Sequence, residues 1–181
     1  MYIILSAPRS RSYWLSQFIG CEHAPGITFR DADDVVEYLR DKDGFADEYL
    51  VVCWRQWLPA LIDAYKDIRI VLIRRPPEET IQSLIERGVP DTPNLHSLIH
   101  NINREMDELT QYNINYYPVY FNKIDDDIRM IWAICHPNQP FPEKKYKKMK
   151  NQKLNNPRTD YVEYVNQNIG NMLMLKLGSM I

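Results

Sequence analysis

The chain has 181 residues, 45% of them hydrophobic, and a formal net charge of −2 at pH 7. This length suits one domain with a sizeable core, and the hydrophobic content excludes a disordered chain. The near-neutral charge argues against a nucleic-acid partner, and the absence of a long apolar run argues against a membrane protein.

Apolar runs and helical periodicities alternate along the chain. Short apolar runs predict strands, and amphipathic stretches with start or stop signals predict helices. In chain order we expect a strand at 2–5, a helix at 12–19, a short strand at 26–30, a helix at 31–40, a strand at 48–54, a helix at 58–66, a strand at 70–73, a helix from 77 to Gly88, a helix at 94–112, a strand at 116–121 and a helix at 125–135. This order predicts the α/β class, with a central parallel sheet in a three-layer αβα domain over residues 1–181.

The most informative stretch follows the first strand directly. Residues 6–17 read Ser-Ala-Pro-Arg-Ser-Arg-Ser-Tyr-Trp-Leu-Ser-Gln. A turn between a buried strand and a helix aims backbone N–H groups and a helix N-terminus at one point, which favours a bound phosphate or sulfate. Arg9 and Arg11 add positive charge there, and Ser10 and Ser12 add hydroxyl donors. The turn is no Walker A motif, since G-x-x-x-x-G-K-[ST] occurs nowhere in the chain.

A second segment has a similar character. Residues 69–88 begin with a buried strand, and two prolines that suit a helix start follow it. Arg75 leaves the end of the strand, and Ser83 lies eight residues later, two turns into the helix. The sequence therefore contains two segments of the kind that binds phosphate, in this order along the chain.

The two segments together resemble the sulfotransferases that use 3′-phosphoadenosine 5′-phosphosulfate. The family's 5′-phosphosulfate loop runs P-[KR]-S-G-[ST]-[ST]-W-[LV], and residues 8–15 match it except that Arg11 stands where most members have Gly. The family also has an Arg after a strand and a Ser eight residues on, which hold the 3′-phosphate. The resemblance covers residues 1–90 well and the remainder loosely, and the C-terminal third is similar to compact bacterial and phage-type members. It implies a fold like that of the P-loop-containing nucleotide hydrolases.

The resemblance also implies the residues of the site. The residues that would bind the co-substrate 3′-phosphoadenosine 5′-phosphosulfate are Arg9, Ser10, Arg11, Ser12, Tyr13, Trp14, Arg75 and Ser83. Most members have a Lys at the position of Arg9, where it stabilises the leaving oxygen, so Arg9 is expected to be catalytic as well. The scheme requires no metal.

The base that would take the acceptor's proton is not at the position that is usual in animal members. Animal members have a His after their second main strand, and Trp57 stands at that place here. His23 is the best remaining candidate for a catalytic base. His96 and His100, four residues apart on the long predicted helix, are more easily explained as surface or core residues.

The implied reaction is the in-line transfer of a sulfuryl group to a hydroxyl or amine of a small-molecule or glycan acceptor. Two alternatives stay open. A non-catalytic nucleotide-binding module of the same fold is favoured by Arg11 in place of Gly and by the missing strand-end His. Another P-loop transferase, such as a small kinase, is disfavoured because the Walker Lys-Ser pair and an obvious magnesium-binding Asp at a strand end are missing.

Two further features bear on surface and compartment. The lysines between Lys144 and Lys153 predict either a solvated helix face or an electrostatic funnel for a nucleotide or an anionic acceptor. Cys21, Cys53 and Cys135 have no metal-ligand spacing, and the N-terminus lacks a signal-peptide pattern. An odd, sparse set of cysteines is typical of reduced thiols, so we expect a cytoplasmic protein.

Overall fold

A computed structural model describes residues 1–24, 29–48, 54–112, 114–152 and 161–178. Its centre is a five-stranded, all-parallel sheet with the order β2-β3-β1-β4-β5. The strands are β1 (Tyr2–Ser6), β2 (Glu22–His23), β3 (Gly44–Asp47), β4 (Arg69–Arg74) and β5 (Asn115–Tyr120). The central strand β1 pairs with β3 on one side and with β4 on the other, so that Ile3 lies opposite Phe45 and Ile70.

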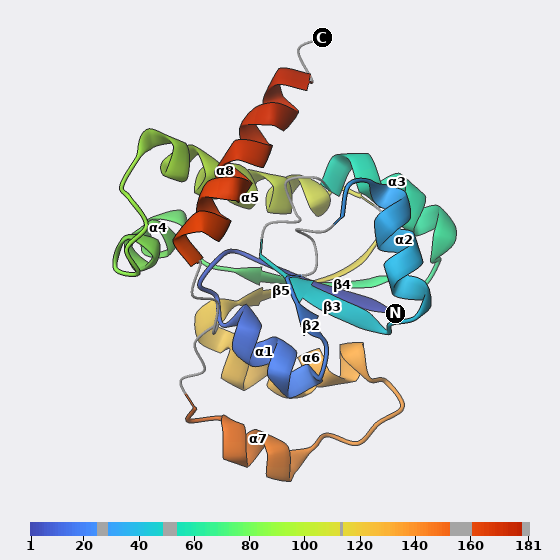
Figure 1. Cartoon of the computed structure of the whole chain (residues 1–181). Coiled ribbons are helices and arrows are strands. Elements are labelled where there is room, and N and C mark those ends of the chain that lie inside the picture. The colour runs from blue at the N-terminus through green and yellow to red at the C-terminus, as the bar shows by residue number, and fades with distance from the viewer. Residues whose placement is uncertain (25–28, 49–53, 113, 153–160, 179–181) are drawn as a thin grey trace.

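Helices cover both faces of this sheet (Figure 1). One face carries α1 (Ser12–Ile19), α6 (Ile124–Cys135), which follows a 3-10 turn at Phe121–Lys123, and α7 (Glu143–Met149). The other carries α2 (Ala32–Arg40), α3 (Trp54–Ala64), α4 (Pro77–Ile85), α5 (Pro93–Leu109) and α8 (Tyr161–Gly178). The predicted α/β class and the αβα layering are confirmed.

The alternation of side chains along β1 explains the two cores. Successive residues of a strand point to opposite faces, so Ile3 and Leu5 pack under α2, α3 and α5 while Tyr2 and Ile4 pack against α1 and α6. All five residues of β1 are buried, as a central parallel strand requires.

Local signals in the sequence set the helix starts. The side chain of Asp31 accepts a hydrogen bond from the Asp34 N–H and caps α2, and Thr92 caps α5 through the Leu95 N–H. Helix α4 begins at Pro77, where the missing proline N–H costs no hydrogen bond. Among these described elements, no helix is both long enough and apolar enough to span a bilayer.

Two predicted strands differ from the structure at their described residues. Of the strand predicted at 48–54, the described residues Glu48 and Trp54 are not in a strand, because β3 ends at Asp47 and α3 begins at Trp54, and 49–53 lie outside the described residues. The sequence did not predict β3 because Gly44 and Asp47 are not typical residues of a buried strand. Gly44 is needed there because a Cβ would press against the Tyr2 ring, and Asp47 is a buried acid. A short strand was predicted at 26–30, but its described residues 29 and 30 are not in a strand. The edge strand of the sheet is Glu22–His23 instead. Helix α8 was not predicted.

Candidate functional site

The loop between β1 and α1 leaves the carboxyl edge of the sheet in a strained conformation. The Ala7 N–H donates to the Ile73 carbonyl at 3.1 Å, which extends the pairing with β4 by one step. Beyond it, Arg9 and Arg11 adopt left-handed backbone conformations with φ of 61° and 62°. Such a conformation costs a non-glycine residue about 1–2 kcal/mol. Arg11 thus adopts a backbone conformation that glycine usually occupies. The turn keeps this strained conformation although no glycine is present there.

The N-terminus of α1 opens toward this loop. Arg11 is the N-cap residue, no side chain caps the first turn, and no acidic residue lies in that turn. The first backbone bond of the helix is donated by the Leu15 N–H to the Arg11 carbonyl. A helix end with uncapped N–H groups and no acidic residue in its own first turn carries a partial positive charge, which an anion would complement.

The structure brings the second predicted segment onto the loop. Arg9 Nε donates to Ser83 Oγ at 3.4 Å, and Arg75 Nη1 donates to the Arg9 carbonyl at 2.5 Å. The Arg75 guanidinium also stacks on the Phe121 ring at 4.5 Å. Residues that are 66 and 74 positions apart in the chain therefore meet at one point.

Charge at this meeting point is incompletely balanced. The Arg75 side chain is only 15% exposed, and burial together with the nearby Arg9 charge lowers its pKa. Arg75 Nε lies 3.8 Å from Glu79 Oε2 and makes no hydrogen bond to any residue that the structure describes. Two neighbouring guanidinium groups favour an anion between them, since it would offset their repulsion and supply the missing acceptor.

Arg11 directs its side chain elsewhere. Its guanidinium forms a two-point contact with the Asp125 carboxylate, at 2.9 and 3.4 Å, and lies over the Trp14 ring at 4.7 Å. Burial raises the pKa of Asp125, but the Arg11 contacts and a hydrogen bond from Tyr146 outweigh it and hold that pKa below its ordinary value. The contribution of Arg11 to the loop is therefore its backbone conformation and this anchor to α6.

A buried polar cluster lies beside the first residue of α1. Ser12 Oγ lies 2.5 Å from Glu48 Oε1 and 3.1 Å from His23 Nε2, and the imidazole and carboxylate are 3.7 Å apart. Both side chains are more than nine-tenths buried. Burial acts to raise the pKa of Glu48, yet the contacts with His23 and Ser12 and the charge of Arg9 lower it overall, so the carboxylate is ionised.

Sequence reasoning placed His23 near the loop but missed Glu48. The acid follows β3, the neighbour of β1, whereas the strand expected at 48–54 had placed it inside a strand and not after one. The available signal was an Asp-Glu pair after a short buried segment, the pattern that places an acid beside a loop of the adjacent strand.

The remaining candidates make the following contacts within the fold. Trp14 is buried, stacks on Phe18 and donates its indole N–H to the Met149 carbonyl at 2.9 Å. Ser10 is buried and donates to the Pro8 carbonyl, and the Tyr13 ring contacts His23 edge-on. His96 pairs with Asp91, His100 is exposed, and Trp57 on α3 is buried in the core beside α2.

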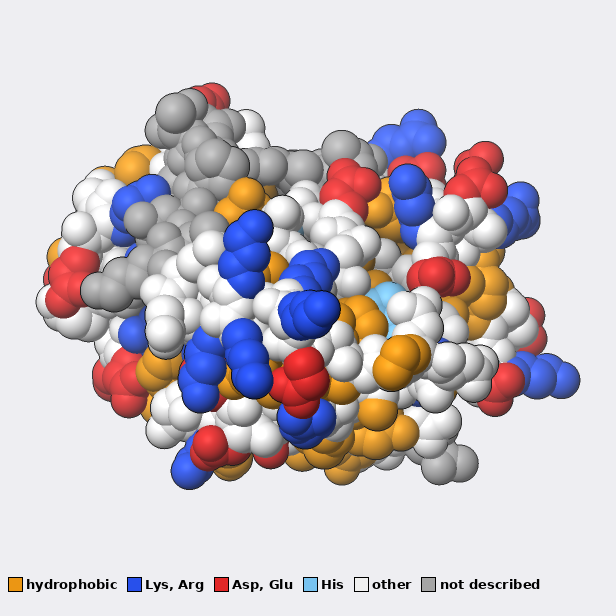
Figure 2. All heavy atoms as spheres, turned by 90° about the horizontal axis from the view of Figure 1, so that it is seen from below, with side chains coloured by type: hydrophobic (Ala, Val, Ile, Leu, Met, Phe, Trp, Pro, Cys, Tyr) orange, Lys and Arg blue, Asp and Glu red, His pale blue; other side chains and the backbone are white. Residues whose placement is uncertain are grey.

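The basic helix α7 lies on the same face of the sheet as α1. Lysine and arginine side chains gather on this face (Figure 2). The end of α7 contacts α1 through the Trp14–Met149 bond, and Lys150 adds positive charge near Asp125, the partner of Arg11. The structure thus places the described end of the predicted lysine patch close to the loop, while Lys153 lies outside the described residues.

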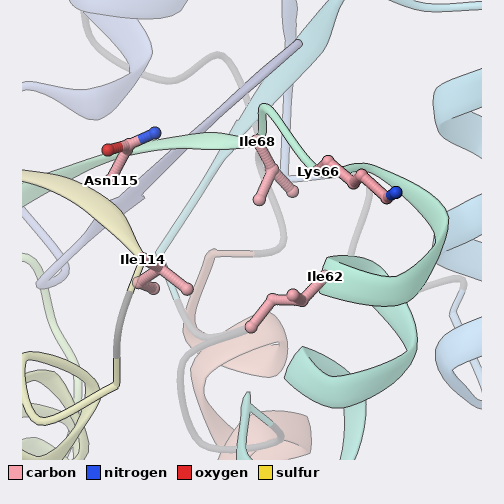
Figure 3. A pocket seen from close by; sticks show the side chains of 5 residues that line it. All are labelled: Ile62, Lys66, Ile68, Ile114 and Asn115. Atoms are coloured by element: carbon pink, nitrogen blue, oxygen red, sulfur yellow. The ribbon is translucent and has the colours of Figure 1, made fainter.

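Two hollows lie at the opposite, amino edge of the sheet. One of about 110 Å³ is surrounded by the side chains of Ile62, Ile68 and Ile114, with Lys66 and Asn115 at its border (Figure 3). A larger one of about 320 Å³ lies beside the starts of β1 and β3 and includes Cys21 and His136.

Over the described ranges, no group of three or more His, Cys, Asp or Glu side chains is arranged to hold a metal ion. Comparison of the chain with protein-family models and with curated proteins finds no match.

Proposed function

We propose that this protein is a sulfotransferase of the P-loop type, which transfers a sulfuryl group from 3′-phosphoadenosine 5′-phosphosulfate to a hydroxyl or amine of a small-molecule or glycan acceptor. The observation that carries this proposal is the convergence of two separate segments. The strained loop at Arg9–Trp14 and the Arg75–Ser83 pair come from different strands and meet through the Arg9 contacts. A donor with two anionic groups needs two such anchors.

Each part of the site has a role in this scheme. The uncapped N-terminus of α1 would hold the 5′-phosphosulfate, and Arg75 with Ser83 would hold the 3′-phosphate. The acceptor oxygen or nitrogen attacks sulfur in line, the bond to the bridging oxygen breaks, and that oxygen leaves with the electron pair on the 5′-phosphate. The proton of the acceptor would pass to a base, the role for which His23 is the candidate. Arg9 would stabilise the charge that develops there, without donating a proton, because a guanidinium stays protonated.

A thermal-shift screen tests the binding half of the proposal. Adenosine 3′,5′-bisphosphate should stabilise the protein, by about 2.7 kcal/mol at 100 times its Kd, while ATP with magnesium should do so much less. Labelled donor offered with phenols, alcohols, sugars and amines then tests transfer. Tight bisphosphate binding without transfer to any acceptor would favour a non-catalytic nucleotide-binding module instead.

One observation favours a second candidate, a magnesium-dependent phosphoryl transferase. Such enzymes hold magnesium with a loop Ser or Thr and an acid at the end of a neighbouring strand. Ser12 and Glu48, 2.5 Å apart, have this relation, and Asp47 precedes Glu48. Stabilisation by ATP with magnesium in excess of that by the bisphosphate would favour this candidate over the sulfotransferase.

A further inference from the structure

Helix α7, together with its C-cap residue, presents a ridge of positive charge to solvent. Every exposed residue from 143 to 150 is a lysine, and we call these five the α7 lysines: Lys144, Lys145, Lys147, Lys148 and Lys150. Tyr146 and Met149 occupy the opposite side of the helix, which packs on the core. The charge of this segment is opposite in sign to the net charge of −2 of the whole chain.

The charge of the ridge is not neutralised by the residues that the structure describes. Among their ion pairs, none involves an α7 lysine. The acid of the helix, Glu143, is engaged by an arginine of α6 instead. Lys145 and Lys150 lie over aromatic rings, at 5.8 and 5.7 Å from the ring centroids, and a ring face does not cancel the charge of an ammonium group. The repulsion among these lysines therefore favours an anionic partner.

The ridge begins beside the proposed donor site. Trp14, in the first turn of α1, donates its indole N–H to the Met149 carbonyl at 2.9 Å, which fixes the end of α7 against α1. Arg11, in the loop, holds Asp125 at 2.9 Å, and the charge of Lys150 acts on the same carboxylate. The other α7 lysines lead away from this point along the helix, on the face that Figure 2 shows.

The length and composition of the ridge favour a polymer with repeated negative groups. The seven residues of α7 extend about 10 Å, so a single small anion contacts only one or two of the lysines. A membrane surface is disfavoured, because the apolar side chains of α7 pack inward and leave none to insert. A nucleic acid is disfavoured by the negative net charge of the chain, and because the described residues of α7 offer no exposed aromatic ring on which a base could stack.

We propose that the α7 lysines are the docking surface for the acceptor, and that this acceptor is an anionic polysaccharide whose repeating units carry carboxylate or sulfate groups. The inference rests on the proposed function, because the occupant must offer hydroxyl groups to the donor as well as negative charges to the ridge. Every unit of such a polysaccharide has both, whereas an acidic peptide has few hydroxyls. The charged units would lie along α7 while a hydroxyl near the Lys150 end reaches the sulfur.

The probe is an alginate oligosaccharide, in which every unit carries a carboxylate, and a neutral dextran oligosaccharide of equal length is compared with it. By calorimetry at low salt, alginate should bind at least about tenfold more tightly than dextran, and its affinity should fall as the salt rises to about 0.15 M. The triple variant Lys144→Gln/Lys147→Gln/Lys148→Gln should weaken alginate binding about 3- to 30-fold, the scale of three exposed ion pairs.

The matched control is Arg40→Gln/Lys42→Gln/Lys66→Gln, which removes the same charge from exposed positions outside α7 and should keep the affinity for alginate. All six substituted side chains are exposed, so both variants should fold. The inference is overturned if alginate binds no better than dextran, or if the two triple variants lose equal affinity for it. Tighter binding of phosphatidylserine vesicles, single-stranded DNA or polyglutamate than of alginate through the same lysines would overturn it as well.

Adenosine 3′,5′-bisphosphate separates this inference from the proposed function. The α7 variant should lose less than about threefold in affinity for the bisphosphate, because the three substituted lysines lead away from the loop. A loss as large as that for alginate would assign the lysines to the nucleotide and overturn the inference. If alginate binds through the α7 lysines but the bisphosphate does not bind, the proposed function fails and the docking surface stands. Tight bisphosphate binding without selective alginate binding gives the reverse result.

Discussion

The two edges of one sheet differ in what they cost the fold. The carboxyl edge carries two left-handed arginines, an uncapped helix N-terminus and a buried ionised carboxylate, each of which is unfavourable in isolation. The amino edge carries the hollows, one of them formed by three isoleucines that pack at ordinary strand and helix ends (Figure 3). A search for the functional site by cavity volume alone would therefore select the amino edge.

Chemistry directs attention to the carboxyl edge instead. Strain and unpaired polar groups persist only where the surrounding structure holds them in place, and such positions concentrate at functional sites. In open α/β sheets the carboxyl ends of the strands are also where ligands bind. From this comparison we infer the site from unfavourable local features and not from empty volume, and the following predictions test that choice.

The largest effect is expected at Arg9. If its guanidinium stabilises the leaving oxygen, Arg9→Ala should lower the rate of sulfuryl transfer about 10²–10³-fold, the scale for loss of one transition-state donor. Arg9→Lys should keep much of the rate, because the charge is retained. Turnover with labelled donor and calorimetry with adenosine 3′,5′-bisphosphate give the two readouts. A loss of affinity as large as the loss of rate would mean that Arg9 acts in binding alone.

The next largest effect is expected at Arg75. Arg75→Ala should weaken adenosine 3′,5′-bisphosphate binding by about 1.5–3 kcal/mol, the scale of a hydrogen bond to a charged group. Adenosine 5′-monophosphate, which lacks the 3′-phosphate, should lose much less. Arg74→Ala is the matched control, because Arg74 pairs with Asp107 and the Met106 carbonyl on α5 and does not contact the loop in the described structure. Equal losses for both nucleotides would show that Arg75 acts through folding or general charge.

Some parts of the carboxyl edge could be predicted from the sequence, and others could not. Contiguous patterns predicted β1, α1, β4 and α4 well, and with them the loop and the Arg75–Ser83 pair, since each lies within one strand–turn–helix unit. Glu48 was missed because its role depends on which strand lies next to β1, and strand order is a property of the assembled sheet. The short strand β3, with a glycine and a buried acid, gave no apolar run to follow. Helix α8 has only a weak amphipathic periodicity in its sequence, so no helical pattern predicted it.

A smaller effect is expected from the anchor of Arg11. Asp125→Ala should lower the free energy of unfolding at pH 7 by about 0.5–1 kcal/mol, because the carboxylate is partly exposed and screened. The pKa of Asp125 is lowered in the folded protein, so its stabilisation is present above the unfolded pKa of about 4 and is lost as the pH falls through the folded value. Urea unfolding of the wild type, Arg11→Ala, Asp125→Ala and the double variant measures the coupling. If the losses of unfolding free energy in the two single variants add up to the loss in the double variant, the two-point contact between Arg11 and Asp125 contributes nothing to stability.

The smallest effect is expected at the amino edge. Lys66 borders the isoleucine-lined hollow and is exposed, and the hollow lies at the opposite end of the strands from Arg9. A single exposed charge at that distance is largely screened by physiological salt. Lys66→Ala should therefore change the affinity for adenosine 3′,5′-bisphosphate by less than about twofold, by calorimetry at 0.15 M salt, although it removes a positive charge just as Arg75→Ala does. A loss comparable with that of Arg75→Ala would place the nucleotide at the amino edge and reverse the comparison between the two edges. A selective loss in Arg75→Ala would instead show that the position of the charge, and not its sign alone, determines binding.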